Sequence, residues 1–172
     1  MYKNIMEKDI NLEISKKLDA KLSSLGAIVY QTRYGDYDLS VTHSIIRKRS
    51  DLSRRGNIIN DSECDLYLSI HLNAEETSAW RGAQVFYDDI NPENIKIGKI
   101  MQEEFSTNLY SRRKMKKVGD LYLSRWVKRP GVLLELGFLS NPNDRYLLKS
   151  SKYQDKLVDV ITGGVLKYFK KK

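Results

Sequence analysis

The stretch DLYLSIHLNA, Asp65 to Ala74, alternates apolar residues with others, as a half-buried β-strand does, and yet it carries a histidine near its end. Leucine and isoleucine side chains would point to one face of such a strand, and Tyr67, Ser69 and His71 to the other. Ligand sites in open α/β sheets lie beyond the carboxyl ends of the strands. His71 is therefore well placed to bind zinc. A structural, hydrogen-bonded histidine is the alternative.

A second apolar run, PGVLLELGFLSN from Pro130 to Asn141, is interrupted by a carboxylate. In a strand over 131–137, Leu133 and Glu135 share one face. A carboxylate between leucines is costly unless it is paired or has a chemical role. Because desolvation raises the pKa of a carboxyl group, Glu135 could act as a general base near neutral pH. An ion pair with one of the many arginines is the alternative.

A third carboxylate lies near the start of the chain. Apolar residues at spacings of four and three predict a helix over 7–25, and Gly26 ends it. The same stripe, followed backwards, reaches Asn11 and then Glu7, so Glu7 lies on the inward face. A favourable interaction with the helix dipole is the other explanation for a carboxylate in the first turn.

The remaining pattern alternates strands with helices. We expect strands over 27–33, 65–72, 82–87, 120–123 and 131–137, and helices over 7–25, 44–62, 92–109, 142–149 and 151–169. This order predicts an α/β fold: one three-layer domain over residues 1–172, with a mostly parallel twisted sheet and helices on both faces.

The 172-residue chain has a net charge of +8, which favours an acidic partner such as nucleic acid, an anionic membrane or an anionic polymer. Two basic runs, Arg47 to Arg55 and Ser111 to Lys117, could grip such a polymer or could simply be solvated. Cys64 is the only cysteine, so no disulfide can form within the chain. We find no phosphate-binding glycine loop, no G-x-S-x-G motif and no cysteine cluster.

Taken in order, several motifs resemble the zinc-dependent N-acetylmuramoyl-L-alanine amidases, and most closely the subgroup that acts on spore-cortex peptidoglycan. These motifs are MEKDINLEISKKL, VYQTR, RGNIIN, SIHLNA, RGAQVFY and PGVLLELGFLSNPND. The resemblance implies that Glu7 and His71 bind Zn²⁺ and that Glu135 is the catalytic glutamate. It also implies a peptidoglycan substrate and an extracytoplasmic place of action, in the cell wall or spore cortex.

One departure from the family matters. A first zinc histidine, in a D-P-G-H-G-G element after the first strand, has no counterpart upstream of Glu7. We therefore expect a chain that is shortened at its N-terminus, lacks the first strand and binds zinc weakly through Glu7 and His71 alone. His43, the other histidine, is a less favoured substitute ligand.

The missing strand would expose a sheet edge, and we expect a partner protein to cover that edge or the metal site. A peptidoglycan-binding module without catalysis stays open as an alternative. A nucleic-acid-binding domain is the other alternative, although we expect no nucleic-acid partner.

Overall fold

Four strands form a single mixed sheet in the order β1-β4-β2-β3. They are β1 (Tyr67–Asn73), β2 (Gln84–Tyr87), β3 (Lys116–Lys117) and β4 (Gly131–Phe138). The computed structural model describes residues 5–43, 45–119, 123 and 126–170. β1 pairs with β4 in parallel, β2 pairs with β4 in antiparallel and with β3 in parallel. The sheet is therefore mostly parallel, as the sequence predicts.

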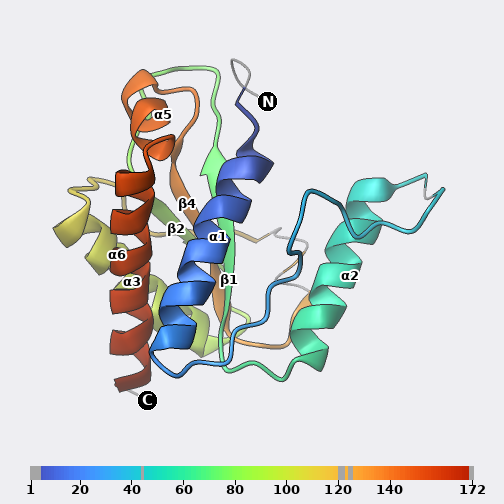
Figure 1. Cartoon of the computed structure of the whole chain (residues 1–172). Helices are drawn as coiled ribbons and strands as arrows, with labels where there is room; N and C mark the ends of the chain where they lie inside the picture. The colour runs from blue at the N-terminus through green and yellow to red at the C-terminus, as the bar shows by residue number, and fades with distance from the viewer. Residues whose placement is uncertain (1–4, 44, 120–122, 124–125, 171–172) are drawn as a thin grey trace.

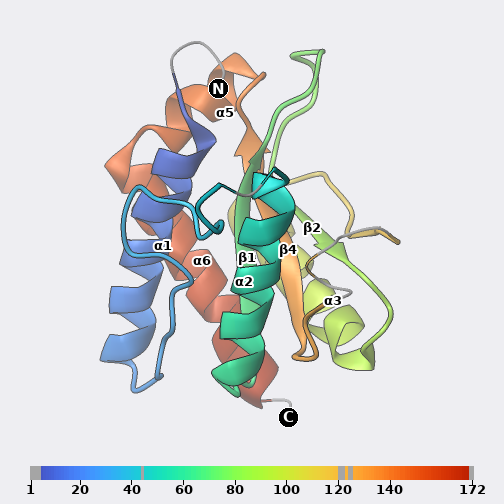
Figure 2. The same ribbon diagram turned by 90° about the vertical axis from the view of Figure 1, so that its right-hand side faces the viewer.

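Helices cover the sheet on both faces (Figure 1). They are α1 (Glu7–Ser24), α2 (Arg47–Asp61), α3 (Pro92–Asn108), α5 (Pro142–Leu148) and α6 (Ser151–Lys170). The helices α1, α3 and α6 pack together on one face. Figure 2 looks onto the opposite face, where α2 lies in front of the strands. The predicted three-layer arrangement is confirmed.

The hydrophobic core lies between the sheet and the three packed helices. It forms one cluster, in which the side chains of Ile14, Ile97, Leu134 and Ile161 are fully buried. The alternation of β4 sends Val132, Leu134 and Leu136 into this core. Its other side chains, Leu133 and Glu135, point to the face of α2.

Two helix starts show why the sequence sets these boundaries. The side chain of Asn91 accepts a hydrogen bond from the Glu93 N–H at the start of α3, and Asn141 accepts from Asn143 and Asp144 at the start of α5. A proline follows each asparagine, in the first helical position, where the missing N–H costs nothing.

The predicted strand over 27–33 is wrong. This segment has no strand structure, and the side chain of Ile28 is 84% exposed. A strand needs a partner for its backbone, and β1, the edge strand, pairs only with β4 among the described residues. Polar contacts hold the segment instead, such as the hydrogen bond from Gln31 Nε2 to Asp19 Oδ2, 2.7 Å long.

The predicted strand over 120–123 is also not confirmed. Leu123 is helical, and residues 120–122 lie outside the described residues. The fourth strand of the sheet is β3, which falls instead within the basic run from Ser111 to Lys117. The N-terminal end of α2 also differs from the predicted helix over 44–62. The helix begins at Arg47, and Ile45 just before it is fully exposed.

Candidate active site

Three polar side chains form a row across three neighbouring strands: His71 and Glu135, which the sequence singled out, and Gln84, which it did not. In the parallel pair His71 of β1 lies opposite Glu135 of β4, and in the antiparallel pair Glu135 lies opposite Gln84 of β2. Side chains of residues paired in this way stand on the same face, about 5 Å apart. The row therefore lies on the α2 face of the sheet, near the carboxyl ends of β1 and β4.

The first turn of α1 adds a carboxylate to one end of this row. Glu7 Oε1 lies 3.0 Å from His71 Nδ1 and accepts hydrogen bonds from the Leu72 N–H and from Asn11 Nδ2, each 3.1 Å long. Burial alone would raise the pKa of Glu7, but these hydrogen bonds outweigh it and hold the pKa below its usual value. The helix thus presents an ionised carboxylate to the imidazole.

Glu135 has a different environment, although it stands in the same row. Its Oε2 is buried and has no hydrogen-bond partner among the described residues. Burial raises the pKa of Glu135 to about 7, the carboxylates of Glu7 and Glu75 act in the same direction, and His71 opposes them. The ion pair with an arginine, open from the sequence, does not form among the described residues. A carboxyl group in this state can exchange a proton near neutral pH.

The Glu7–His71 pair fits a metal ion as two of its ligands. An imidazole nitrogen and a carboxylate oxygen are both zinc ligands, and bonds of about 2.0–2.2 Å place two tetrahedral ligand atoms about 3.4 Å apart. The observed separation of 3.0 Å is close to this value. Within the described part of the chain, no group of three His, Cys, Asp or Glu side chains could hold a metal. Among these residues, therefore, no third ligand joins Glu7 and His71. His43, the substitute ligand considered from the sequence, does not form such a group with them.

The loop between β1 and β2 is tied firmly to the end of β4. Asp144 Oδ2, in α5, accepts hydrogen bonds from the N–H groups of Gly82 and Phe138, at 2.8 and 2.9 Å. Asn141 Nδ2 also donates to the Ser78 carbonyl, at 2.7 Å. These contacts fix the wall of the site next to Glu135.

Sequence reasoning missed Gln84 and Arg113. The Arg113 side chain donates from Nε and Nη2 to Gln84 Oε1, at 3.1 and 2.7 Å. Gln84 Nε2 in turn donates to the Lys114 carbonyl, at 2.8 Å. The strand register places Gln84 next to Glu135, and Arg113 is linked to Glu135 only through Gln84. The basic run from Ser111 to Lys117 contains Arg113, but nothing in the sequence singles out this arginine.

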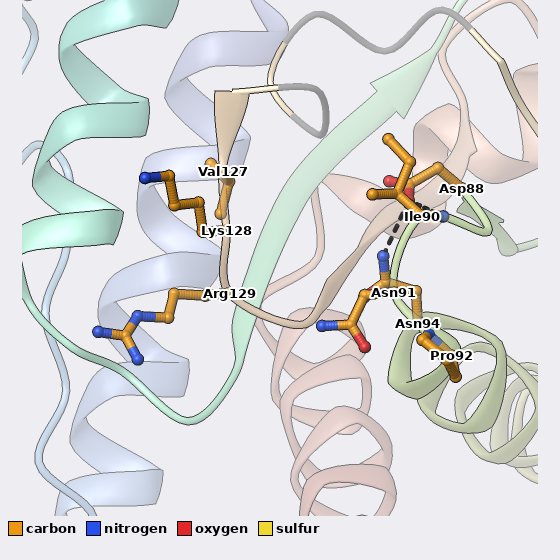
Figure 3. A pocket seen from close by; sticks show the side chains of 8 residues that line it. All are labelled: Asp88, Ile90, Asn91, Pro92, Asn94, Val127, Lys128 and Arg129. Atoms are coloured by element: carbon orange, nitrogen blue, oxygen red, sulfur yellow. Dashed lines mark hydrogen bonds between the residues drawn. The ribbon is translucent and has the colours of Figure 1, made fainter.

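A pocket of about 370 Å³ lies at the other end of the sheet and does not belong to this site (Figure 3). It sits where α3 begins and β4 starts, four residues or about 13 Å along the strand from Glu135. Its buried carboxylate, Asp88, accepts hydrogen bonds from the Ile90 N–H and Asn94 Nδ2, and Asn94 Oδ1 accepts from Gly131. These satisfied polar groups fix the start of the strand.

Comparison with known proteins agrees with the geometry. The family model described as N-acetylmuramoyl-L-alanine amidase matches residues 1–167. A germination-specific N-acetylmuramoyl-L-alanine amidase of Bacillus subtilis (strain 168) is 43% identical, in a match that covers 98% of this chain and 73% of the relative. The amidase LytC of the same organism is 30% identical over 96% of this chain, which spans 32% of that relative.

Solved structures give the same answer. The CwlD amidase of Clostridioides difficile, in complex with the GerS lipoprotein, matches with a TM-score of 0.94 and 35% identity over 99% of this chain and 89% of that one. An N-acetylmuramoyl-L-alanine amidase of Clostridium difficile 630 matches with a TM-score of 0.84 and 30% identity, over 99% and 87% of the two chains. With its fold, its site and its relatives in agreement, the chain belongs to the N-acetylmuramoyl-L-alanine amidase family.

Proposed function

We propose that this protein hydrolyses the amide between N-acetylmuramic acid and the L-alanine of the peptidoglycan stem peptide in the spore cortex, with Glu135 as the general base and with Glu7 and His71 as zinc ligands. The observation that carries the proposal is the Glu135 carboxylate, whose Oε2 is buried without a hydrogen-bond partner among the described residues. It stands in one row with His71, which Glu7 contacts. The family likeness supports the reaction, and the germination-specific relative supports the cortex as its place.

Glu135 would move the protons of the reaction. A carboxyl group whose pKa is about 7 is ionised in a large share of molecules at neutral pH, so it can take a proton from the attacking water. The same group, now protonated, can give that proton to the nitrogen of the leaving alanine. Removal of such a base typically slows a reaction by about 10²–10⁴-fold.

Glu7 and His71 would hold the metal ion beside that carboxyl group. Zinc, when bound, supplies a Lewis acid that polarises the scissile carbonyl and lowers the pKa of water. The hydrogen bonds from Leu72 and Asn11 orient the Glu7 carboxylate, and contacts of this kind raise metal affinity by fixing the ligand.

The chain's charge fits the proposed substrate and location. A net charge of +8 suits a polymer that carries stem-peptide carboxylates. Action outside the cytoplasm is part of the proposal, and the cell-wall and germination amidases among the relatives support it. No helix of the described residues is long and apolar enough to cross a membrane.

A protein partner is also part of the proposal. The CwlD neighbour was solved with a lipoprotein bound. Here β1 is an edge strand of the described sheet, and a strand edge can pair with another chain.

The direct test is to incubate the protein with purified cortex peptidoglycan, with added zinc and with a chelator. The expected products are new N-terminal alanine residues without new reducing sugar ends, and only with zinc. Binding to the polymer without release of alanine would favour a binding module and overturn the proposal. DNA binding that weakens steeply with salt would favour the nucleic-acid alternative.

A further inference from the structure

We infer that Arg113 is a binding site for a carboxylate of the substrate, placed one or two residues from the bond that is cut. The inference deepens the proposed function and rests on it for the identity of the substrate. It is built from the position of Arg113, from the lack of a counter-ion among the described residues and from the contacts that hold the side chain.

The position follows from the strand register. Gln84 stands next to Glu135 on the same face of the sheet, and Arg113 is hydrogen-bonded to the side chain of Gln84. Neighbouring strands are about 4.8 Å apart, so the guanidinium lies roughly 5–10 Å from Glu135. One peptide residue spans at most about 3.6 Å. The guanidinium can therefore reach a group one or two residues from a scissile amide at Glu135.

The side chain is held rigidly by its surroundings. The Arg113 guanidinium carbon lies 4.7 Å from the ring centre of Trp80 and 5.4 Å from that of Phe138. The Arg113 N–H donates to Ser111 Oγ, which donates to the Ala83 carbonyl of the neighbouring segment. Because little side-chain entropy remains to be lost, such a cation can bind an anion at low cost.

The charge of this cation is not neutralised. A guanidinium has five N–H donors. Arg113 directs two of them to Gln84, and the other three have no acceptor among the described residues. No Asp or Glu within the described residues forms an ion pair with Arg113, whereas Arg55 pairs closely with Asp51. Gln84 fixes the orientation of Arg113 as a glutamate would, but as a neutral amide it leaves the positive charge available.

The chemistry of the free donors selects the ligand. Parallel N–H groups of a guanidinium match the two oxygens of a carboxylate. A stem peptide that is attached through L-alanine offers such a group if its second residue is an acidic amino acid with a free carboxylate. Replacement of that carboxylate by a carboxamide keeps the shape and removes the charge, so the two forms make a sharp pair of probes.

The experiment uses two muramoyl tripeptides that differ only at the second residue, which carries either a free carboxylate or a carboxamide. Their binding to the chain would be measured by calorimetry, in chelator so that no cleavage occurs. We expect the carboxylate form to bind about 10- to 100-fold more tightly, the range for a hydrogen bond to a charged group. In Arg113→Gln this preference should disappear, and in Arg113→Lys part of it should remain.

Arg112→Gln is the matched control, since it removes the same charge from an exposed neighbour, and it should leave the preference intact. Thermal unfolding of each variant shows whether it folds. If Arg113→Gln does not fold, Arg113→Lys is the test, and its preference for the carboxylate form should be smaller than that of the unaltered protein. Equal binding of the two tripeptides by the unaltered protein would overturn the inference, as would an unchanged preference in a folded Arg113→Gln. Failure of the proposed function appears separately, as the absence of alanine release from cortex peptidoglycan.

Discussion

One face of the central sheet forms the hydrophobic core and the other forms the candidate active site, and β4 contributes side chains to both. On the face toward α1, α3 and α6, Val85 and Leu134 are completely buried in the core. On the face toward α2, the neighbouring positions hold Gln84 and Glu135, next to His71. One strand therefore sends alternate side chains into a close-packed core and into a polar site.

The difference between the faces shows that the polar site lowers the stability of the fold. A buried leucine stabilises the fold by removing apolar surface from water, whereas a buried carboxylate without a partner opposes folding whenever it is ionised. Glu135 keeps a raised pKa for this reason. The apolar face therefore contributes most of the stability, and truncation of its side chains should destabilise the fold more than truncation on the polar face.

The largest expected effect is on catalysis. Glu135→Gln is nearly isosteric but cannot accept a proton, so amide hydrolysis on cortex peptidoglycan should fall by about 10²–10⁴-fold while the fold is kept. Glu103→Gln, at an exposed position of α3, is the control and should leave the rate unchanged. A Glu135→Gln variant with near-normal turnover would show that Glu135 is not the base.

The next effect separates the two faces by stability. Leu134→Ala removes a fully buried side chain from the core and should lower the free energy of unfolding by about 2–5 kcal/mol. Leu133→Ala, one residue earlier and on the other face, should cost only about 1 kcal/mol. Urea unfolding of both variants measures the difference, and equal losses would contradict the division between the faces.

A smaller effect should appear in the pH dependence. Glu135 titrates near 4.5 in the unfolded chain and near 7 when folded, so between these values the folded state keeps a proton that the unfolded state has lost. Stability should therefore fall as pH rises through this window. From pH 5 to pH 8 the loss from Glu135 should be about 2–3 kcal/mol.

Glu135→Gln removes that contribution. Measured in chelator, the stability of the variant relative to the unaltered protein should increase from pH 5 to pH 8 by the same amount. A difference between the two proteins that does not change with pH would mean that the folded pKa of Glu135 is ordinary.

Sequence patterns predicted best where a local signal and burial agreed. The helix over 92–109 was found as α3 (Pro92–Asn108), because its apolar periodicity coincides with the cap at Asn91 and with Pro92. The strand over 27–33 failed because its apolar and aromatic composition favours a strand, while pairing depends on a partner elsewhere in the chain. β3 was missed because two lysines in a basic run carry no apolar alternation.

The site residues also fall into those that the sequence singled out and those that it did not. Glu7, His71 and Glu135 stood out because each interrupts or extends an apolar pattern, and the structure brings Glu7 to His71 and places His71 opposite Glu135. Gln84 and Arg113 did not stand out, because a glutamine in a strand and an arginine in a basic run are ordinary residues. Only the antiparallel register of β2 and β4 makes them neighbours of Glu135.

The central claim is that Glu7 and His71 hold a zinc ion beside a base that is not itself a ligand. The most direct measurement is zinc affinity, by competition with a chromophoric chelator, for the unaltered protein and for Glu7→Gln, His71→Ala and Glu135→Gln. The account predicts that Glu7→Gln and His71→Ala abolish zinc binding and that Glu135→Gln leaves it in place. Zinc affinity that is unchanged in His71→Ala or in Glu7→Gln would contradict it.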